Sequence, residues 1–209
     1  MMNDIVRLDI DNDIAFIYMD GPNGNIMNND WFVGFNKVMG QLSYHEIRGL
    51  VITGASRNFS SGIDFKTLHE SLDRNNNTFF DYSNVYKSVE YIRSLHFKKY
   101  PVVAAIKRMC IGSGFELALA CHYRVCDKTA NLGSVEVDFG MMPGVGASVR
   151  LPRLIDRGRA LELIMTGRMY KSETALNLGV IDMIVPPSEL LSTAISFIDK
   201  INPDNKLPG

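Results

Sequence analysis

The amino-acid sequence predicts an α/β fold, in which short buried strands alternate with amphipathic helices. Apolar runs such as 101–106 have the length of a buried strand, whereas the apolar residues after Asn29 recur at helical spacing. The chain has 209 residues, of which 46% are hydrophobic, so it can bury one substantial core. We therefore expect a single domain over residues 1–201 and a frayed polar tail over residues 202–209.

In the first half of the chain, the pattern predicts a β-hairpin followed by helices and strands in turn. Alternating apolar residues flank Asp11-Asn12-Asp13, a turn-forming cluster that indicates two antiparallel strands. The expected elements in order are two strands, a helix, a strand, a polar loop and a helix, over 5–10, 14–18, 29–42, 50–52, 71–77 and 85–95.

The second half continues the alternation, and glycines mark a point where a strand turns into a helix. Gly112 and Gly114 separate a buried strand from a strongly apolar helix. The expected elements in order are a strand, a helix, two short strands, two helices, a strand and a final helix, over 101–106, 115–120, 123–126, 130–133, 146–155, 159–166, 181–185 and 190–201.

The charge balance argues against nucleic acids and anionic membranes as partners. The 22 basic residues stand against 23 acidic ones, which leaves no surplus to neutralise phosphates. No apolar run approaches the length of about 18 residues that a membrane span needs. The segment Met1–Asp13 mixes charges into the region where a signal peptide needs an apolar run. We therefore expect a cytoplasmic chain whose partner is a small molecule or another protein.

The cysteines predict neither a disulfide framework nor a metal site. Cys110, Cys121 and Cys126 are an odd number and contain no CxxC pair. Buried, reduced thiols fit this pattern better.

Familiar phosphate-binding and nucleophile motifs do not match. Gly112-Ser113-Gly114 is followed by Leu117 where a dinucleotide fingerprint needs a third glycine, and Gly144-Val145-Gly146 is followed by Val149. There is no GxxxxGK[ST] segment, and no serine lies in a GxSxG elbow.

Two glutamates are the candidate acid–base residues. Glu116 lies in a helix whose neighbours are all apolar, so we expect desolvation to raise the pKa of its carboxyl toward neutrality. The alternative is an exposed glutamate on the rim of that helix. Glu136 precedes a glycine-rich loop, and its alternative is an ordinary acid in the first turn of a helix.

Three windows of the sequence carry a resemblance to a known family: Gly49–Gly54 with Asn58–Lys66, then Pro101–Leu119, then Gly133–Gly146. They resemble the crotonase superfamily of enoyl-CoA hydratases and isomerases, and they occur in the same order as in that family. Segments 161–167 and 175–185 extend the likeness over nearly the whole chain. The resemblance implies a crotonase-like spiral of ββα units with a truncated C-terminal helical region. This superfamily includes hydratases, isomerases and enzymes of other reactions that share one fold.

The same resemblance implies a thioester site. The backbone N–H groups of Ile63 and Ser113 would form an oxyanion hole. Glu116 would activate a water, Glu136 would supply the proton to Cα, and the Gly144 N–H would contact the water. The two carboxyls would titrate as a pair.

Three positions depart from the common family pattern. A side chain at Ser113 is expected to strain its turn or narrow the thioester slot, because glycine is usual there. Phe115 and His122 are expected to alter the shape and the charge of the pocket. His122 itself is expected to be structural.

Lys66 and Arg57 are the candidate residues for coenzyme A phosphates, with solvated surface charges as the alternative. No separate cofactor is implied, since coenzyme A or phosphopantetheine is part of the substrate. An acyl carrier protein, as in polyketide pathways, is the alternative carrier to the acyl-CoA of fatty acid metabolism. The family habit implies a homotrimer or a dimer of trimers.

The leading hypothesis is a lyase that hydrates a trans-2-enoyl thioester or dehydrates the 3-hydroxyacyl thioester. A double-bond isomerase, which needs one acid, is the second hypothesis. A non-catalytic binding or assembly subunit is the third.

Overall fold

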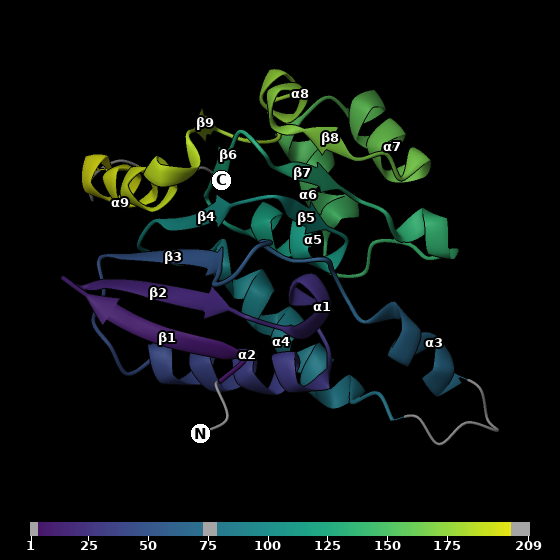
Figure 1. Ribbon diagram of the computed structural model, residues 1–209, viewed down its shortest axis with the longest axis horizontal. Coiled ribbons are helices and arrows are strands. Elements are labelled where there is room, and N and C mark those ends of the chain that lie inside the picture. The colour runs from purple at the N-terminus through teal and green to yellow at the C-terminus, as the bar shows by residue number, and fades with distance from the viewer. Residues whose placement is uncertain (1–3, 73–78, 202–209) are drawn as a thin grey trace.

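The computed structural model describes residues 4–72 and 79–201, which form a large sheet, a small sheet and surrounding helices (Figure 1). The strands are β1 (Val6–Asp11), β2 (Ile14–Met19), β3 (Gly49–Gly54), β4 (Val102–Ile106), β5 (Met109–Ile111), β6 (Tyr123–Asp127), β7 (Asn131–Gly133), β8 (Tyr170–Lys171) and β9 (Met183–Val185). The helices are α1 (Pro22–Asn25), α2 (Asn29–Leu42), α3 (Phe65–Leu72), α4 (Tyr82–Leu95), α5 (Ser113–Ala120), α6 (Ala147–Leu154), α7 (Arg157–Thr166), α8 (Ser172–Asn177) and α9 (Leu190–Lys200), with short 3-10 helices η1 (Glu136–Phe139) and η2 (Pro187–Glu189).

The large sheet has the order β1-β2-β3-β4-β6-β9, and only the β1–β2 hairpin is antiparallel. The small sheet has the order β5-β7-β8. Parallel neighbours need crossover connections, and here helices or the small sheet supply them. The predicted α/β class, the hairpin and the spiral of strand and helix units are confirmed.

Helices cover both faces of the large sheet (Figure 1). Side chains of a strand alternate between its faces, so Leu50 and Ile52 point into the larger core beneath α2, α4 and α5. Val51 points to the other face, where Ala194 and Ile198 of α9 cover it. Strands buried on both faces read as continuous apolar runs, which is why β3 and β4 carry no alternation.

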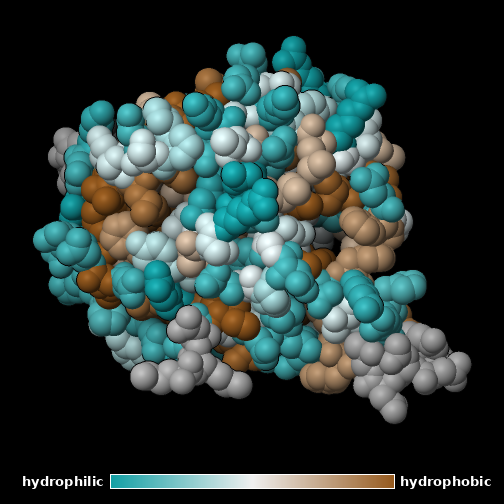
Figure 2. Space-filling view, viewed as in Figure 1, coloured by the Kyte–Doolittle hydropathy of each residue, from teal (hydrophilic) through white to brown (hydrophobic). Residues whose placement is uncertain are grey.

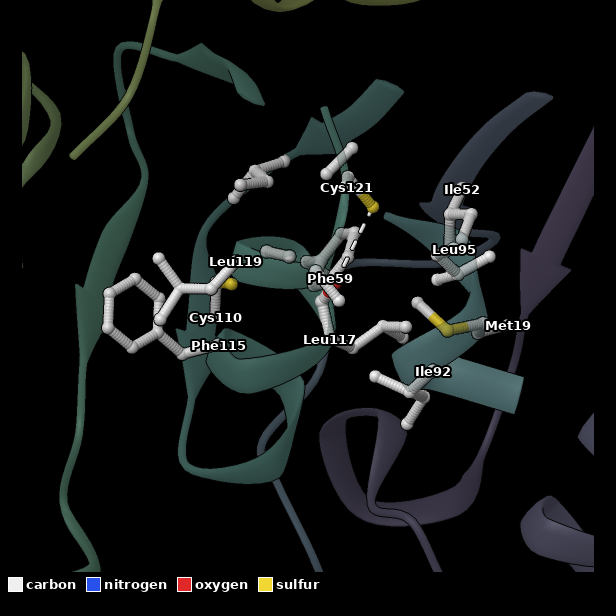
Figure 3. Close-up of a cluster of buried hydrophobic side chains, with 14 of the residues drawn as sticks. Met19, Ile52, Phe59, Ile92, Leu95, Cys110, Phe115, Leu117, Leu119 and Cys121 are labelled. Atoms are coloured by element: carbon white, nitrogen blue, oxygen red, sulfur yellow. Dashed lines mark hydrogen bonds between the residues drawn. The ribbon is translucent and has the colours of Figure 1, made fainter. Parts of the chain in front are cut away.

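Helix α5 lies at the centre of the larger core and is buried along its whole length. Figure 3 shows Phe115 and Leu119 on one side of α5, and Leu117 on the other side, near Ile92 of α4. An isolated helix of eight residues is only marginally stable in water, so tertiary packing stabilises α5. Glu116 therefore extends from a helix that is rigid and shielded from water.

Several short elements differ from the predictions. The sequence pattern did not indicate β5, β8 or α8. Each of these elements is too short to show a clear hydrophobic period, whether of a strand or of a helix. The predicted polar loop 71–77 begins inside α3, whose last residue is Leu72, and the rest of that loop lies outside the described residues. The predicted strand 181–185 is confined to β9, and the predicted tail 202–209 also lies outside the described residues.

The expectation that Phe115 shapes the substrate pocket is wrong. Its ring is fully buried and packs against the side chains of Leu132, Leu163 and Leu178, on the side of β7, α7 and α8. All three cysteines are buried free thiols, as predicted.

Within residues 4–72 and 79–201, no helix is both long and apolar enough to span a bilayer. On the face shown in Figure 2, polar side chains cover most of the surface, and apolar side chains gather in separate patches.

The packing of Phe115 predicts the effect of its truncation. Removing a fully buried aromatic ring leaves a cavity, so Phe115→Ala should lower the free energy of unfolding by about 3–5 kcal/mol. Urea denaturation measures this change. Tyr44→Ala is the matched control, because the Tyr44 side chain is exposed, and it should change stability by less than about 0.5 kcal/mol. An equally small loss for Phe115→Ala would contradict the packing described here.

Candidate active site

Two turns bring unpaired backbone N–H groups to the same region. Ile63 follows Gly62, and Ser113 follows Gly112; both glycines have positive φ. A Cβ added to Gly62 would lie 3.5 Å from the Ser113 nitrogen, so the two turns are in close contact. Across the described residues, neither the Ile63 nor the Ser113 N–H donates to a protein acceptor. These two predicted oxyanion donors are therefore brought together and left free.

The backbone around Ser113 differs from the prediction of strain. The positive φ belongs to Gly112, whereas Ser113 is the first residue of α5 and has no positive φ. A side chain is accepted there without strain, because the first position of a helix has ordinary helical geometry. The N–H of Ser113 also points out of a helix N-terminus, where the dipole favours negative charge.

Asn25 holds the turn that carries Ile63, and the sequence analysis missed it. Its fully buried side chain accepts a hydrogen bond from the Gly21 N–H at 2.8 Å and donates to the Phe59 carbonyl. Its own carbonyl accepts from the Ser60 hydroxyl at 2.9 Å, and that hydroxyl also accepts from the Gly62 N–H at 3.1 Å. The signal available in the sequence was only a turn-forming run, 21–25.

Glu116 is almost completely buried, with an exposed fraction of 1%, so the alternative of an exposed rim position is wrong. Its Oε1 accepts three backbone hydrogen bonds, from Val145 at 2.8 Å, Gly146 at 2.7 Å and Ala147 at 2.9 Å. Its Oε2 is buried and has no hydrogen-bond partner in the described part of the chain. Burial raises the pKa of Glu116 to about 7, the three N–H donors oppose the rise, and the charge of Glu136 adds to it.

Glu136 is the first residue of η1, so it is a first-turn acid, and its carboxyl is also buried. Its Oε2 accepts a hydrogen bond from the Ser134 hydroxyl at 2.7 Å. Its Oε1 is buried without a partner among the described atoms and lies 3.8 Å from where a Cβ on Gly112 would stand. Ser134, a second residue that the sequence analysis missed, therefore orients the free oxygen toward the turn of Ser113.

Aromatic rings join the two halves of this region. The rings of Phe65, at the start of α3, and Phe139, at the end of η1, lie 4.4 Å apart between centroids. The segment after Ile63 thus packs against the segment after Glu136, which stabilises the site as one unit.

The other predicted residues are not part of the buried carboxyl pair, and three of them are exposed at the surface. Gly144 is exposed, next to the loop that holds Glu116. Lys66 and Arg57 are exposed, and the Lys66 Nζ lies 4.0 Å from a Glu70 carboxylate oxygen. The structural role predicted for His122 is confirmed, since its Nδ1 accepts from the Val102 N–H at 3.0 Å.

Taken together, the region holds two buried carboxyl groups, each with one free oxygen, beside two free N–H donors. Unsatisfied buried polar atoms are rare in native proteins and point to a bound water or substrate group. A carboxyl with a pKa near 7 can both accept and donate a proton at neutral pH. This arrangement can move protons on a molecule whose oxygen the N–H pair holds.

A comparison with protein families identifies the family of the chain. Residues 9–207 match the family model of enoyl-CoA hydratase/isomerase. The chain belongs to the enoyl-CoA hydratase/isomerase family. The family is described by hydratase and isomerase activity.

The chain is similar to a curated relative and to several solved structures. This chain is 40% identical over 154 residues to the peroxisomal fatty acid beta-oxidation multifunctional protein MFP2 of Arabidopsis thaliana. The match covers 73% of this chain and 21% of that protein. The chain thus spans about a fifth of that relative's length.

Two enoyl-CoA hydratase structures share the fold. The one from Bacillus anthracis has a TM-score of 0.80 and 28% identity, covering 95% of this chain and 78% of its own. The one from Thermoplasma volcanium has a TM-score of 0.82 and 26% identity, covering 96% and 79%. A Thermobifida fusca structure described as a complex with CoA has a TM-score of 0.82 and 26% identity, covering 96% and 80%.

The raised pKa of Glu116 predicts a pH dependence of stability. The folded state binds this proton more tightly than the unfolded chain, so stability falls as the pH rises from 4.5 to about 7 and is level above that. Glu116→Gln removes the effect, so its stability relative to the native chain should rise by about 3 kcal/mol across that window. Urea denaturation at a series of pH values measures the difference.

Glu46→Gln is the control for this series, because Glu46 is exposed. Its stability difference from the native chain should stay constant over the same window. A constant difference for Glu116→Gln would show that Glu116 is ionised normally in the folded state.

Proposed function

We propose that this family member hydrates a trans-2-enoyl thioester to the 3-hydroxyacyl thioester, and catalyses the reverse dehydration. The observation that carries the proposal is the pair of buried, unpartnered carboxyl oxygens, Oε2 of Glu116 and Oε1 of Glu136, beside the free N–H groups of Ile63 and Ser113. Addition of water needs two proton transfers and a place for negative charge. Those are the groups that this region supplies.

The thioester oxygen would bind to the N–H groups of Ile63 and Ser113. When a nucleophile adds at Cβ, electron density moves through Cα to this oxygen and forms an enolate. Donors that are already aimed at the oxygen stabilise that charge without reorganisation, and loss of one such donor typically costs about 3–4 kcal/mol in the transition state.

The two glutamates would divide the proton transfers. Glu116 in its ionised form accepts a proton through Oε2 from the water, whose oxygen forms the new bond to Cβ. The two carboxyls hold one proton in common, and when that proton lies on Glu136 it passes through Oε1 to Cα as the enolate collapses. The double bond is consumed, one water is added, and one proton has passed from Glu136 to the product while another has reached Glu116. Exchange with the next water restores both groups, and the Gly144 N–H would contact that water.

The carrier of the acyl group is proposed to be coenzyme A, with no separate cofactor. The structure from Thermobifida fusca, described as a complex with CoA, and the beta-oxidation protein of Arabidopsis thaliana support this choice over an acyl carrier protein. Lys66 and Arg57 are proposed to meet the CoA phosphates. Both side chains are exposed, and Lys66 would exchange its contact with Glu70 for a phosphate. A homotrimer or dimer of trimers and a cytoplasmic location stay predictions.

Substitution of each glutamate tests the reaction. Glu116→Gln and Glu136→Gln keep the shape of the side chain and remove its acid, so each should lower the rate of hydration by about 10²–10⁴-fold. The loss of enoyl-thioester absorbance with crotonyl-CoA and longer trans-2-enoyl-CoAs measures the rate. Glu46→Gln, at an exposed site, should hydrate at the native rate.

Other outcomes would favour the other hypotheses. Double-bond migration that survives the loss of one glutamate would assign the chain as an isomerase. A folded native chain that binds no acyl-CoA and no acyl carrier protein would assign it as a non-catalytic subunit.

The oxyanion hole is tested at Ser113. Proline lacks an N–H but fits the first position of a helix, so Ser113→Pro should lower kcat/KM by about 10²–10³-fold with an unchanged fold. Ser113→Ala keeps the N–H and should retain most of the activity. Steady-state kinetics and far-UV circular dichroism measure both variants. Equal loss in the two variants would assign the role to the hydroxyl instead.

A further inference from the structure

A cavity of about 420 Å³ lies beside the loop 143–146, whose N–H groups at Val145 and Gly146 bind Glu116. Neither glutamate of the acid–base pair lines it, and neither do Ile63 and Ser113. Its walls come from the end of α4, the end of α5, β6, the loop 143–146 and α6. They carry no acidic side chain and four arginines: Arg93, Arg124, Arg150 and Arg153.

Two of these arginines are neutralised and two are not. Arg93 pairs with Glu90 at 3.5 Å, and Arg124 pairs with Asp182 at 3.2 Å. In the part of the chain that the structure describes, no carboxylate lies within salt-bridge distance of Arg150 or Arg153.

The histidines of the cavity do not supply a counter-charge. His122 is buried, and its two ring nitrogens are engaged with Val102 and with the carbonyl of His96. Burial and then the charges of Arg150, Arg153 and Arg124, in that order, lower the pKa of His96. The unpaired guanidinium groups of Arg150 and Arg153, and the paired one of Arg124, therefore all act on His96, and no acidic side chain lines the cavity. The charge of Glu116, which lies outside the lining, acts on Arg150.

Arg150 is held in place before any ligand arrives. Its Nη1 donates to the Val145 carbonyl at 2.7 Å, and the guanidinium lies so close over Gly146 that a Cβ there would collide with it. A guanidinium that is half-buried and fixed by one hydrogen bond keeps its other N–H groups for an oxyanion.

We propose that this cavity binds an organic anion, with a phosphate or carboxylate group on Arg150 and Arg153 and an apolar body against the surrounding wall. The apolar wall includes Phe97, whose side chain is 81% exposed, together with Val149 and Leu154. An exposed aromatic ring beside unpaired arginines suits a ligand that is charged at one end and apolar at the other. The cavity shares the loop residues Gly144, Val145 and Gly146 with the proposed thioester site, but none of its carboxyl groups or oxyanion donors, and the proposal does not depend on the proposed function.

Isothermal titration with phenyl phosphate tests the site. The native chain should bind one equivalent, inorganic phosphate should bind more weakly, and benzyl alcohol should not bind. Arg150→Met and Arg153→Met should each weaken binding of phenyl phosphate by about tenfold or more, because each removes a charge-assisted hydrogen bond. Arg153 is exposed, so its variant keeps the test valid if Arg150→Met fails to fold. Arg159→Met, at an exposed arginine of α7 outside the cavity, should bind as the native chain does.

Three results would overturn the proposal. The first is the absence of saturable binding, or equal binding by the native chain and Arg153→Met. The second is displacement of phenyl phosphate by coenzyme A in direct competition, which would assign the cavity to the thioester carrier. The third is a change in sedimentation of Arg153→Met with no change in titration, which would assign the cavity to contact with a second copy of the chain.

Discussion

The arrangement of the site depends on three backbone N–H groups that converge on one carboxylate oxygen. Burial of Glu116 in an apolar helix disfavours its charge, and the N–H groups of Val145, Gly146 and Ala147 recover part of that free energy. The same three bonds tie α5 to the start of α6 and leave Oε2 as the free oxygen. A single interaction thus sets the protonation, the orientation and the surroundings of the proposed base.

The rest of the site is made mainly of backbone. The proposed oxyanion donors are main-chain N–H groups, so their positions depend on the turns at Gly62 and Gly112 and on Asn25, which binds the first of these turns from within. Such a site tolerates Ser113 in place of glycine, because the positive φ lies one residue earlier. Side-chain identity matters at the two carboxyls and at Ser134, which orients one of them.

The sequence pattern predicted those features that depend on residues close together in the chain. The hairpin, the helix over 29–42 and the burial of Glu116 follow from alternation, helical spacing and apolar neighbours, and the structure has all three. Asn25 and the cationic cavity could not be predicted in this way. Asn25 acts on Phe59, 34 residues away, and the cavity draws arginines from separate elements. The error at Phe115 has the same origin, since adjacency to Glu116 in the chain did not reveal that its ring points toward Leu132 of β7 and Leu163 of α7.

Among the described residues, β1 and β9 are the two edge strands of the large sheet. Unpaired edge strands invite pairing with strands of other molecules, and charge or brevity protects against it. Strand β1 places Arg7 and Asp9 at its exposed edge region, whereas β9 has only three residues and is followed by Pro186 and Pro187. The large sheet is therefore protected against edge-to-edge pairing by charge at β1 and by shortness at β9.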